Sequence, residues 1–307
     1  MTDTTWNPTN IGDLEGRTYL VTGANGGIGY HASAQLLRAG AAVIMAARNP
    51  DRLDAAVNAI CSADPSAADR IQRLRIDTSS ISSSIAAAEH VASSSLDGLL
   101  LNAGLVKGPK KRTVTPEGHE LLFATNILGH FAFAGTILPR LSGESPRIVW
   151  MGSSTAIKGH YEFTDPEVST GYAPMKAYAN SKAATTMVGV EAHRRLRNAG
   201  SPVVSVIAHP GYSLGGRGPR VSGVNEPSLG QRVMDTLQSP FSQTKEQGAH
   251  APVRALVDPA VRGAEFVGPD GYKGPTVRAD APAYTTDEAA GRRLWEYLEG
   301  ATHTVWP

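Results

Sequence analysis

The chain has 307 residues, of which 41% are hydrophobic and 19% are charged, a balance that supports a sizeable core and excludes a disordered chain. Lysine and arginine number 29 and aspartate and glutamate number 28, so the net charge is +1. The one basic cluster, Lys107, Lys110, Lys111 and Arg112, is too short to indicate a nucleic-acid partner. The single cysteine, Cys61, excludes an intrachain disulfide and fits a reducing compartment.

The N-terminal segment and the apolar stretches argue against membrane targeting. Residues 1–13 are polar and lack the basic and apolar regions of a signal peptide, so we expect a cytoplasmic protein. The longest apolar stretch, 121–138, is interrupted by polar residues and glycine, which predicts a buried helix rather than a membrane span. No linker separates a second unit, so we expect one domain over 12–307 after a tail of residues 1–11.

Short apolar runs alternate with helical stretches over the first 210 residues. The runs are nearly continuous in apolar residues, as in strands buried on both faces, and lie at 17–22, 42–47, 72–76, 96–101, 146–152 and 202–208. Helices are expected near 27–39, 51–63, 80–94, 117–141 and 174–199. The alternation predicts an α/β fold with a doubly wound, parallel, Rossmann-like sheet.

The composition of the sequence changes after Pro210. Residues 211–245 are rich in glycine, serine and proline, which predicts a mobile surface segment with a short helix near 228–238. A last strand is expected near 264–267, followed by a turn region. The final helix is predicted to start at Thr285, which has capping-box spacing to Glu288. We interpret this part as a C-terminal extension of the same domain.

A glycine-rich motif, TGANGGIG at 22–29, follows the first predicted strand and opens the first helix. Glycines in this context allow a tight turn and let backbone amides of a helix N-terminus approach a pyrophosphate. The motif predicts a dinucleotide site formed by Gly23, Asn25, Gly26, Gly27, Ile28 and Gly29. Its glycines fit both TGxxxGxG and TGxxGxxG, so the spacing alone leaves two kinds of enzyme open.

The end of the second predicted strand indicates which nicotinamide cofactor the site prefers. An NAD site places an acid here to bind the ribose 2′-hydroxyl, whereas this chain has Ala47 and Arg48, followed by Asn49. Because an arginine can hold a 2′-phosphate through charge-assisted hydrogen bonds, we expect NADP, with NAD the weaker candidate.

Two Tyr-x-x-x-Lys pairs lie close together, and either could supply a proton-transfer group. On a helix this spacing places both side chains on one face, where an ammonium can lower the pKa of a tyrosine. Pro174 lies between Tyr172 and Lys176, and proline is tolerated only in the first turn of a helix. We therefore expect the helix to begin near Pro174, which makes Tyr178 with Lys182 the acid–base pair and leaves Tyr172 in a loop.

Taken together, the motifs resemble those of the short-chain dehydrogenase/reductase family over residues 12–300. They occur in the family's order: TGANGGIG, LLLNAG at 99–104, TNILGHF at 125–131, MGSS at 151–154, AYANSK at 177–182 and HPG at 209–211. The NAG tripeptide is typical of the core branch rather than the extended sugar-nucleotide branch. TNILGHF, the long gap before Tyr178, and RRLWEYLE at 292–299 are similar to the retinol-dehydrogenase-like group and its bacterial relatives.

The resemblance implies a catalytic tetrad of Asn126, Ser154, Tyr178 and Lys182. The serine would polarise a carbonyl, and we expect Ser154, the second of the pair, with Ser153 as the alternative. Tyr178 would exchange the proton, and Lys182 would lower its pKa and bind the nicotinamide ribose. In the family, Asn126 holds a water that connects the lysine to solvent.

Further cofactor contacts are implied at three other strand ends. Asp77 and Thr78 would lie at the adenine, and Pro210 and Gly211 near the nicotinamide. The residues of the NAG tripeptide, Asn102, Ala103 and Gly104, would lie along the dinucleotide. The family usually has a hydroxyl four residues after that glycine, where this chain has Gly215. Ser213 or backbone amides are the expected substitutes.

The predicted function is an NADP-dependent interconversion of a carbonyl and an alcohol on a small or medium apolar substrate, without a metal. The alternatives are a non-catalytic NADP redox sensor and a quinone or enone reductase on the same fold. The substrate pocket would be built from 155–177 and 212–245. The helices 117–141 and 174–199 could pair two subunits, as they do in many family members, so a homodimer or homotetramer is open.

Overall fold

In the computed structural model of the chain, residues 6–8, 11–91, 95–157 and 164–307 are described. Their main feature is an eight-stranded sheet with the order β10-β9-β6-β5-β4-β1-β2-β3. The strands are β1 (Thr18–Thr22), β2 (Ala42–Ala47), β3 (Ile71–Arg75), β4 (Gly98–Leu101), β5 (Arg147–Met151), β6 (Val204–Ala208), β9 (Glu265–Pro269) and β10 (Thr276–Asp280). All neighbours pair in parallel except β10, which runs antiparallel to β9. The predicted doubly wound parallel sheet is confirmed.

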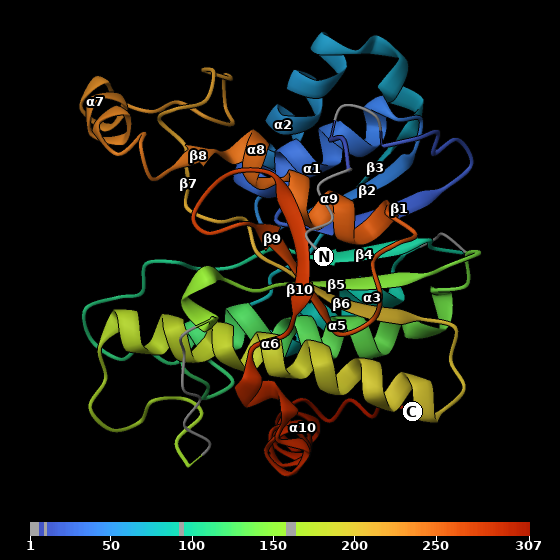
Figure 1. The fold of residues 1–307 in the computed structure, drawn as a ribbon, viewed down its shortest axis with the longest axis vertical. Coiled ribbons are helices and arrows are strands. Elements are labelled where there is room, and N and C mark those ends of the chain that lie inside the picture. Colours follow the sequence, from blue (N-terminus) through green and yellow to red (C-terminus); the bar gives the residue numbers. More distant parts are fainter. Residues whose placement is uncertain (1–5, 9–10, 92–94, 158–163) are drawn as a thin grey trace.

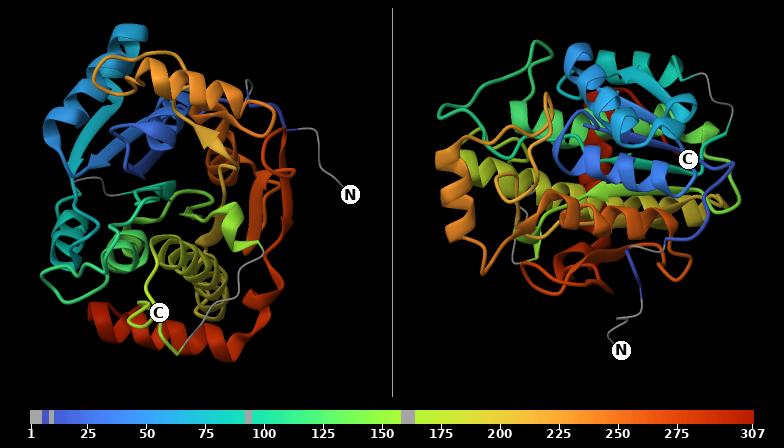
Figure 2. Two further views of the ribbon diagram at one scale, coloured as in Figure 1. Left: turned by 90° about the vertical axis from the view of Figure 1, so that its left-hand side faces the viewer. Right: turned by 90° about the horizontal axis from the view of Figure 1, so that it is seen from above.

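Helices cover both faces of this sheet (Figure 1, Figure 2). One face carries α1 (Gly27–Arg38), α2 (Pro50–Ala63) and α9 (His250–Val257), and the other carries α3 (Ile81–Glu89), α5 (Gly129–Ile137), α6 (Pro174–Asn198) and α10 (Glu288–Thr302). Each strand supplies both layers, because successive side chains point to opposite faces. In β1, for example, Tyr19 and Val21 lie in one buried cluster and Leu20 in the other.

Helix α6 begins where the sequence predicted. Pro174 is its first residue and Ala173 is the N-cap, so Tyr172 lies outside the helix. The Tyr172 hydroxyl donates to the carbonyl of Pro109 at 3.3 Å, which holds it in the loop before α6. Tyr178 and Lys182 both lie inside the helix, one turn apart.

The predicted helix over 117–141 starts later and is irregular. Residues 115–119 form a turn closed by a hydrogen bond from Thr115 N to the carbonyl of His119, and the helix begins with α4 (Leu121–Phe123). A π-helical turn, Ala124–Leu128, separates α4 from α5. Within the described part of the chain, Leu121–Arg140 is the one segment apolar and long enough to cross a membrane, and 78% of its most apolar window is buried inside the protein.

The C-terminal third differs most from the prediction. β10 was not expected, and the proposed capping box at Thr285 is wrong, because Thr285 lies in a short 3₁₀ turn before the helix. Asp287 caps α10 instead, accepting a hydrogen bond from Ala290 N at 2.9 Å. The last residues of the helix predicted at 80–94 lie outside the described residues, as do 158–163 of the expected substrate segment and most of the tail 1–11.

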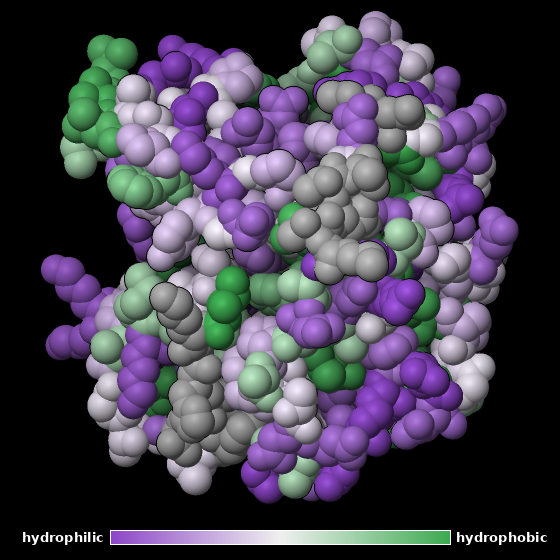
Figure 3. All heavy atoms as spheres, in the orientation of Figure 1, coloured by the Kyte–Doolittle hydropathy of each residue, from purple (hydrophilic) through white to green (hydrophobic). Residues whose placement is uncertain are grey.

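The segment after β6 is tied together at its two ends. β7 (Ser213–Leu214) pairs with β8 (Gln243–Thr244), and the short helix α8 (Lys245–Gly248) follows at once. Helix α7 (Leu229–Leu237) matches the predicted short helix at 228–238. It projects from the body of the molecule and carries an exposed apolar surface (Figure 3).

Candidate active site

A cavity of about 510 Å³ opens at the carboxyl ends of the parallel strands. This is the edge at which open α/β sheets bind ligands, because the loops that follow neighbouring strands meet there. The cavity brings together most of the predicted site residues, namely Gly23, Asn25, Gly26, Gly27, Ile28, Arg48, Asn49, Asp77, Thr78, Asn102, Ala103, Gly104, Tyr178, Lys182 and Pro210.

The glycine-rich turn leaves space for a ligand and for close packing. Gly23 has φ +68°, and a Cβ there would lie 2.9 Å from the Cα of Ala103. A Cβ on Gly29 would lie 2.4 Å from the carbonyl oxygen of Gly23. Gly29 therefore allows the close packing of α1 against the turn after β1, and its role as a cofactor contact stays a prediction.

A buried network fastens the glycine turn to the end of β4. The Thr22 hydroxyl accepts hydrogen bonds from the amides of Asn102 (2.9 Å) and Ala103 (3.0 Å) and lies 3.0 Å from Nε2 of His130. Asn102 also donates from its side chain to the carbonyl of Thr22 at 2.8 Å. Burial lowers the pKa of His130 to about 3, so the ring is neutral and can serve as a fixed hydrogen-bond partner. Sequence reasoning did not assign Thr22 or His130, although both lie within the quoted motifs.

At the end of β2 the cavity is lined by basic side chains. Arg48 lies 3.9 Å from Asp77 across the cavity wall, and 69% of its side chain is exposed. Asn49 accepts a hydrogen bond from Arg52 N at 2.9 Å and so caps α2, which directs that helix N-terminus at the cavity. Arg52 also lines the cavity and was missed, because its one sequence signal is its place in the first turn of α2.

Tyr178 meets a serine at the opposite end of the cavity, and that serine is Ser153. The Tyr178 hydroxyl donates to Ser153 Oγ at 3.3 Å, and both residues are buried. Ser154, the expected tetrad member, begins a 3₁₀ turn (Ser154–Ala156). Ser153, the alternative named from the sequence, has extended backbone just after β5, with φ −155° and ψ 151°, and is the serine that contacts Tyr178 in this structure. Ser154 as the member of the tetrad stays a prediction.

Lys182 and Asn126 lie behind Tyr178. The Lys182 ammonium donates to the carbonyl of Met151 at 2.7 Å. In the π-helical turn, Asn126 accepts from Leu105 N at 2.8 Å and donates to Ser181 Oγ at 2.9 Å. A Cβ on Gly104 would lie 2.9 Å from Asn126 Oδ1 and 3.7 Å from Lys182 Nζ, so these two groups lie close together beside the NAG loop.

Burial shifts both groups of the acid–base pair toward their neutral forms. It raises the pKa of Tyr178, while the hydrogen bond with Ser153 acts in the opposite direction. It lowers the pKa of Lys182 to about 8. In this structure the Lys182 ammonium donates to the Met151 carbonyl, and its effect on the pKa of Tyr178 stays a prediction.

The loop after β6 contributes less than expected. Pro210 lines the cavity, but Gly211 and Ser213 do not. Gly211 has φ +60° and packs against the carbonyl of Tyr272, 2.4 Å from where its Cβ would lie. The Ser213 hydroxyl donates to the Pro210 carbonyl at 2.7 Å and so stabilises the loop in this structure. Its role as a substitute for the hydroxyl missing at Gly215 stays a prediction.

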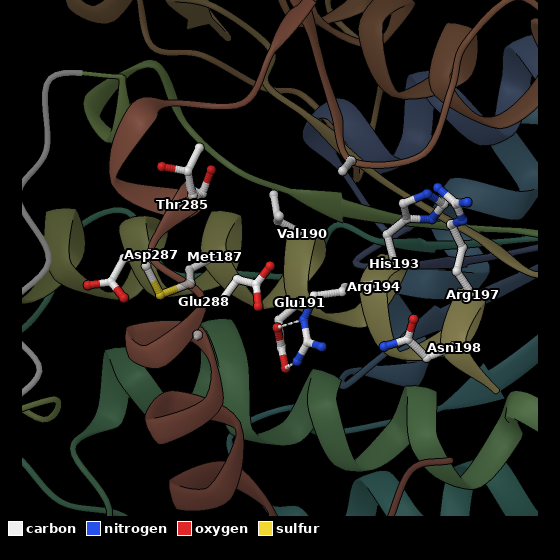
Figure 4. Close-up of a pocket in the computed structure, with 13 residues that line it drawn as sticks. Met187, Val190, Glu191, His193, Arg194, Arg197, Asn198, Thr285, Asp287 and Glu288 are labelled. Atoms are coloured by element: carbon white, nitrogen blue, oxygen red, sulfur yellow. Dashed lines mark hydrogen bonds and ion pairs between the residues drawn. The ribbon is translucent and has the colours of Figure 1, made fainter.

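A second cavity, of about 530 Å³, lies between α6 and the start of α10, away from these residues (Figure 4). Within its lining, Glu191 accepts a hydrogen bond from Arg194 at 2.8 Å. Across the described residues, no cluster of three or more histidine, cysteine or acidic side chains could hold a metal ion.

The first cavity fits a nicotinamide dinucleotide. The glycine-rich turn and the uncapped first turn of α1 line it, together with the basic side chains at the end of β2 and the buried pair of Tyr178 and Lys182. Fold and site together define an oxidoreductase of the dinucleotide-binding class.

Comparison with known proteins agrees with this class. The family model for short chain dehydrogenase matches residues 17–214. A Streptomyces lividans protein described as "Probable oxidoreductase" is 33% identical over 300 residues, covering 93% of this chain and 97% of that protein. Human retinol dehydrogenase 13 is 31% identical over 290 residues, covering 92% and 83%. A solved structure of an uncharacterised Mycobacterium paratuberculosis protein aligns with a TM-score of 0.79 at 30% identity, covering 98% and 99%. The chain belongs to the short-chain dehydrogenase/reductase family, with relatives among the retinol dehydrogenases.

Proposed function

We propose that this protein is an NADP-dependent oxidoreductase that interconverts a carbonyl and an alcohol, with Tyr178 as the proton donor and acceptor. The observation that carries the proposal is the hydrogen bond of 3.3 Å from Tyr178, which lines the dinucleotide cavity, to the buried Ser153. A buried hydroxyl pair of this kind can bind one oxygen atom of a substrate from two sides.

The chain's residues divide the chemistry among them. In reduction, Tyr178 gives its proton to the carbonyl oxygen, and Ser153 holds that oxygen in place; in oxidation, Tyr178 accepts the alcohol proton. Lys182, buried and held by the Met151 carbonyl, supplies positive charge behind the tyrosine as it loses its proton. Asn126 fixes the loop at Leu105 beside the lysine. The nicotinamide, when bound, supplies or takes the hydride.

The preference for NADP is supported by charge at the end of β2. Ala47 offers no carboxylate to a ribose 2′-hydroxyl, while Arg48 and Arg52 line the same end of the cavity. Two guanidinium groups favour a 2′-phosphate, which an acid at position 47 would repel.

An apolar substrate is supported by the wall next to Tyr178. Leu105 and Val106 line the cavity there, and Val106 is 59% exposed. The retinol dehydrogenases among the relatives carry the name of an apolar alcohol, which agrees with this class of substrate.

The test is NADPH consumption, followed by absorbance, with a panel of aldehydes, ketones, quinones and enones, each also presented to the Tyr178→Phe protein. We expect turnover with apolar carbonyls that the variant lacks. Turnover with quinones or enones alone would replace the proposal by a reductase on the same fold. Tight NADPH binding without any turnover would replace it by a redox sensor.

A further inference from the structure

Lys245 lies directly over the glycine-rich turn, although it follows that turn by more than two hundred residues. It is the first residue of α8 and lines the dinucleotide cavity. Its Nζ lies 3.3 Å from the place that a Cβ on Gly27 would take, and 3.8 Å from the corresponding place on Gly215. The ammonium is therefore held between α1 and the segment that follows β6.

The position of Lys245 is fixed by its neighbours. Thr244 and Gln247 form a capping box around it, with Gln247 N donating to Thr244 Oγ1 at 3.1 Å and Thr244 N donating to Gln247 Oε1 at 3.0 Å. Gln35 of α1 donates to the carbonyl of Glu246 at 3.1 Å. Helices α1 and α8 are thus fastened together, and the lysine side chain has a defined direction toward the cavity.

The ammonium has no partner of its own among the described residues. It donates no hydrogen bond there and forms no ion pair, and Asp235, the carboxylate whose field reaches it, accepts a hydrogen bond from Gly216 N at 2.7 Å. Partial burial lowers the pKa of Lys245. Removing a cation from water without giving it a partner raises the free energy of the folded protein, and a bound anion would offset this desolvation cost.

The surroundings indicate which anion fits. The first turn of α1 has no side-chain cap and no acidic residue, so its amides are open toward the same space. Val224 also borders this space, and its carbonyl oxygen lies 3.6 Å from the position that a Cβ on Gly26 would take. A phosphate group suits this space, because some of its oxygens can accept hydrogen bonds from the helix amides while others accept from the ammonium.

We propose that Lys245 clamps the pyrophosphate of the bound dinucleotide. The proposal rests on the proposed function only in that the site takes a nicotinamide dinucleotide; it does not depend on the choice between NADP and NAD. Both cofactors share the pyrophosphate, whereas only NADP has the 2′-phosphate that Arg48 would bind. Lys245 therefore acts on both cofactors equally.

The test is calorimetric titration of the Lys245→Met protein, which keeps the aliphatic bulk and removes the charge. NADPH and NADH should each bind about ten- to a hundredfold more weakly, by the same factor. ADP-ribose should also weaken, and 2′-AMP, which lacks the pyrophosphate, should bind as in the wild type. Lys245→Arg should stay within a few-fold of wild type, and Lys110→Met, at an exposed lysine, should change nothing.

Two outcomes would overturn the proposal. Wild-type affinity of Lys245→Met for both dinucleotides would show that the ammonium does not contact the pyrophosphate. An equal loss of affinity for ADP-ribose and for 2′-AMP would show a general distortion of the site. If thermal unfolding shows that the Lys245→Met protein is unstable, the titrations are repeated with Lys245→Gln. Because the readout is binding, absence of turnover with every carbonyl would refute the proposed function and leave this result standing.

Discussion

Replacement of Arg48 by alanine tests the cofactor preference at a single side chain. A charge-assisted contact is worth about 1.5–3 kcal/mol when desolvated. The Arg48 side chain is 69% exposed, and solvent screens such contacts, so the low end applies: about 1.5 kcal/mol, or about tenfold in NADPH affinity. The change also leaves the Asp77 carboxylate, now 3.9 Å from the guanidinium, without its countercharge near the phosphate, which acts in the same direction.

Fluorescence titration of NADPH and NADH into wild type, Arg48→Ala and Ala47→Asp measures this effect. Arg48→Ala should weaken NADPH about tenfold and leave NADH nearly unchanged, because NADH has no 2′-phosphate. Ala47→Asp should weaken NADPH and strengthen NADH, since the new carboxylate repels the phosphate and accepts from the free 2′-hydroxyl. Equal NADPH affinity in wild type and Arg48→Ala would refute the reasoning and point to Arg52 and Asn49 as the phosphate contacts, or to NAD as the cofactor.

Two further predictions concern the acid–base site. Ser153→Ala should lower kcat at least tenfold while Ser154→Ala keeps most activity, because the Tyr178 hydroxyl is hydrogen-bonded to Ser153. Steady-state kinetics with one active carbonyl separates the two variants, and the reverse order would favour Ser154 as the catalytic serine. The pKa of Lys182 is lowered to about 8 in the folded protein, so between pH 8 and its usual value near 10.5 the unfolded chain binds more protons. The free energy of unfolding of the wild type, measured against Lys182→Met by urea denaturation, should therefore rise with pH across that window; a difference independent of pH would contradict the burial argument.

Much of the fold could be predicted because its signals are local. The strands of the parallel sheet are continuous apolar runs, and Pro174 marks the start of α6 by its missing amide hydrogen. β10 has no such signal, since it is a half-exposed edge strand after a glycine-rich turn and depends on pairing with β9. The helix over 121–140 was recognisable by its apolar residues, but its π-helical turn was not.

The site residues, too, were predictable only where their signal is local in the sequence. Residues in sequence motifs were found, whereas Arg52 and Lys245 reach the cavity only through the packing of α2 and α8. Ser153 and Ser154 differ by one position, and which one faces Tyr178 depends on whether the backbone is still extended there, a property that the sequence of two adjacent serines does not determine.

The central claim is that Tyr178 transfers the proton, and Tyr178→Phe beside Tyr172→Phe tests it most directly. Both changes remove one hydroxyl, but only Tyr178 lies in the cavity wall beside Ser153, whereas Tyr172 donates to the Pro109 carbonyl in a loop. Turnover of an apolar carbonyl and NADPH affinity are measured on both variants. Tyr178→Phe should abolish measurable turnover with NADPH affinity within a few-fold of wild type, and Tyr172→Phe should keep most of its activity. Turnover that persists in Tyr178→Phe and is lost in Tyr172→Phe would contradict the assignment.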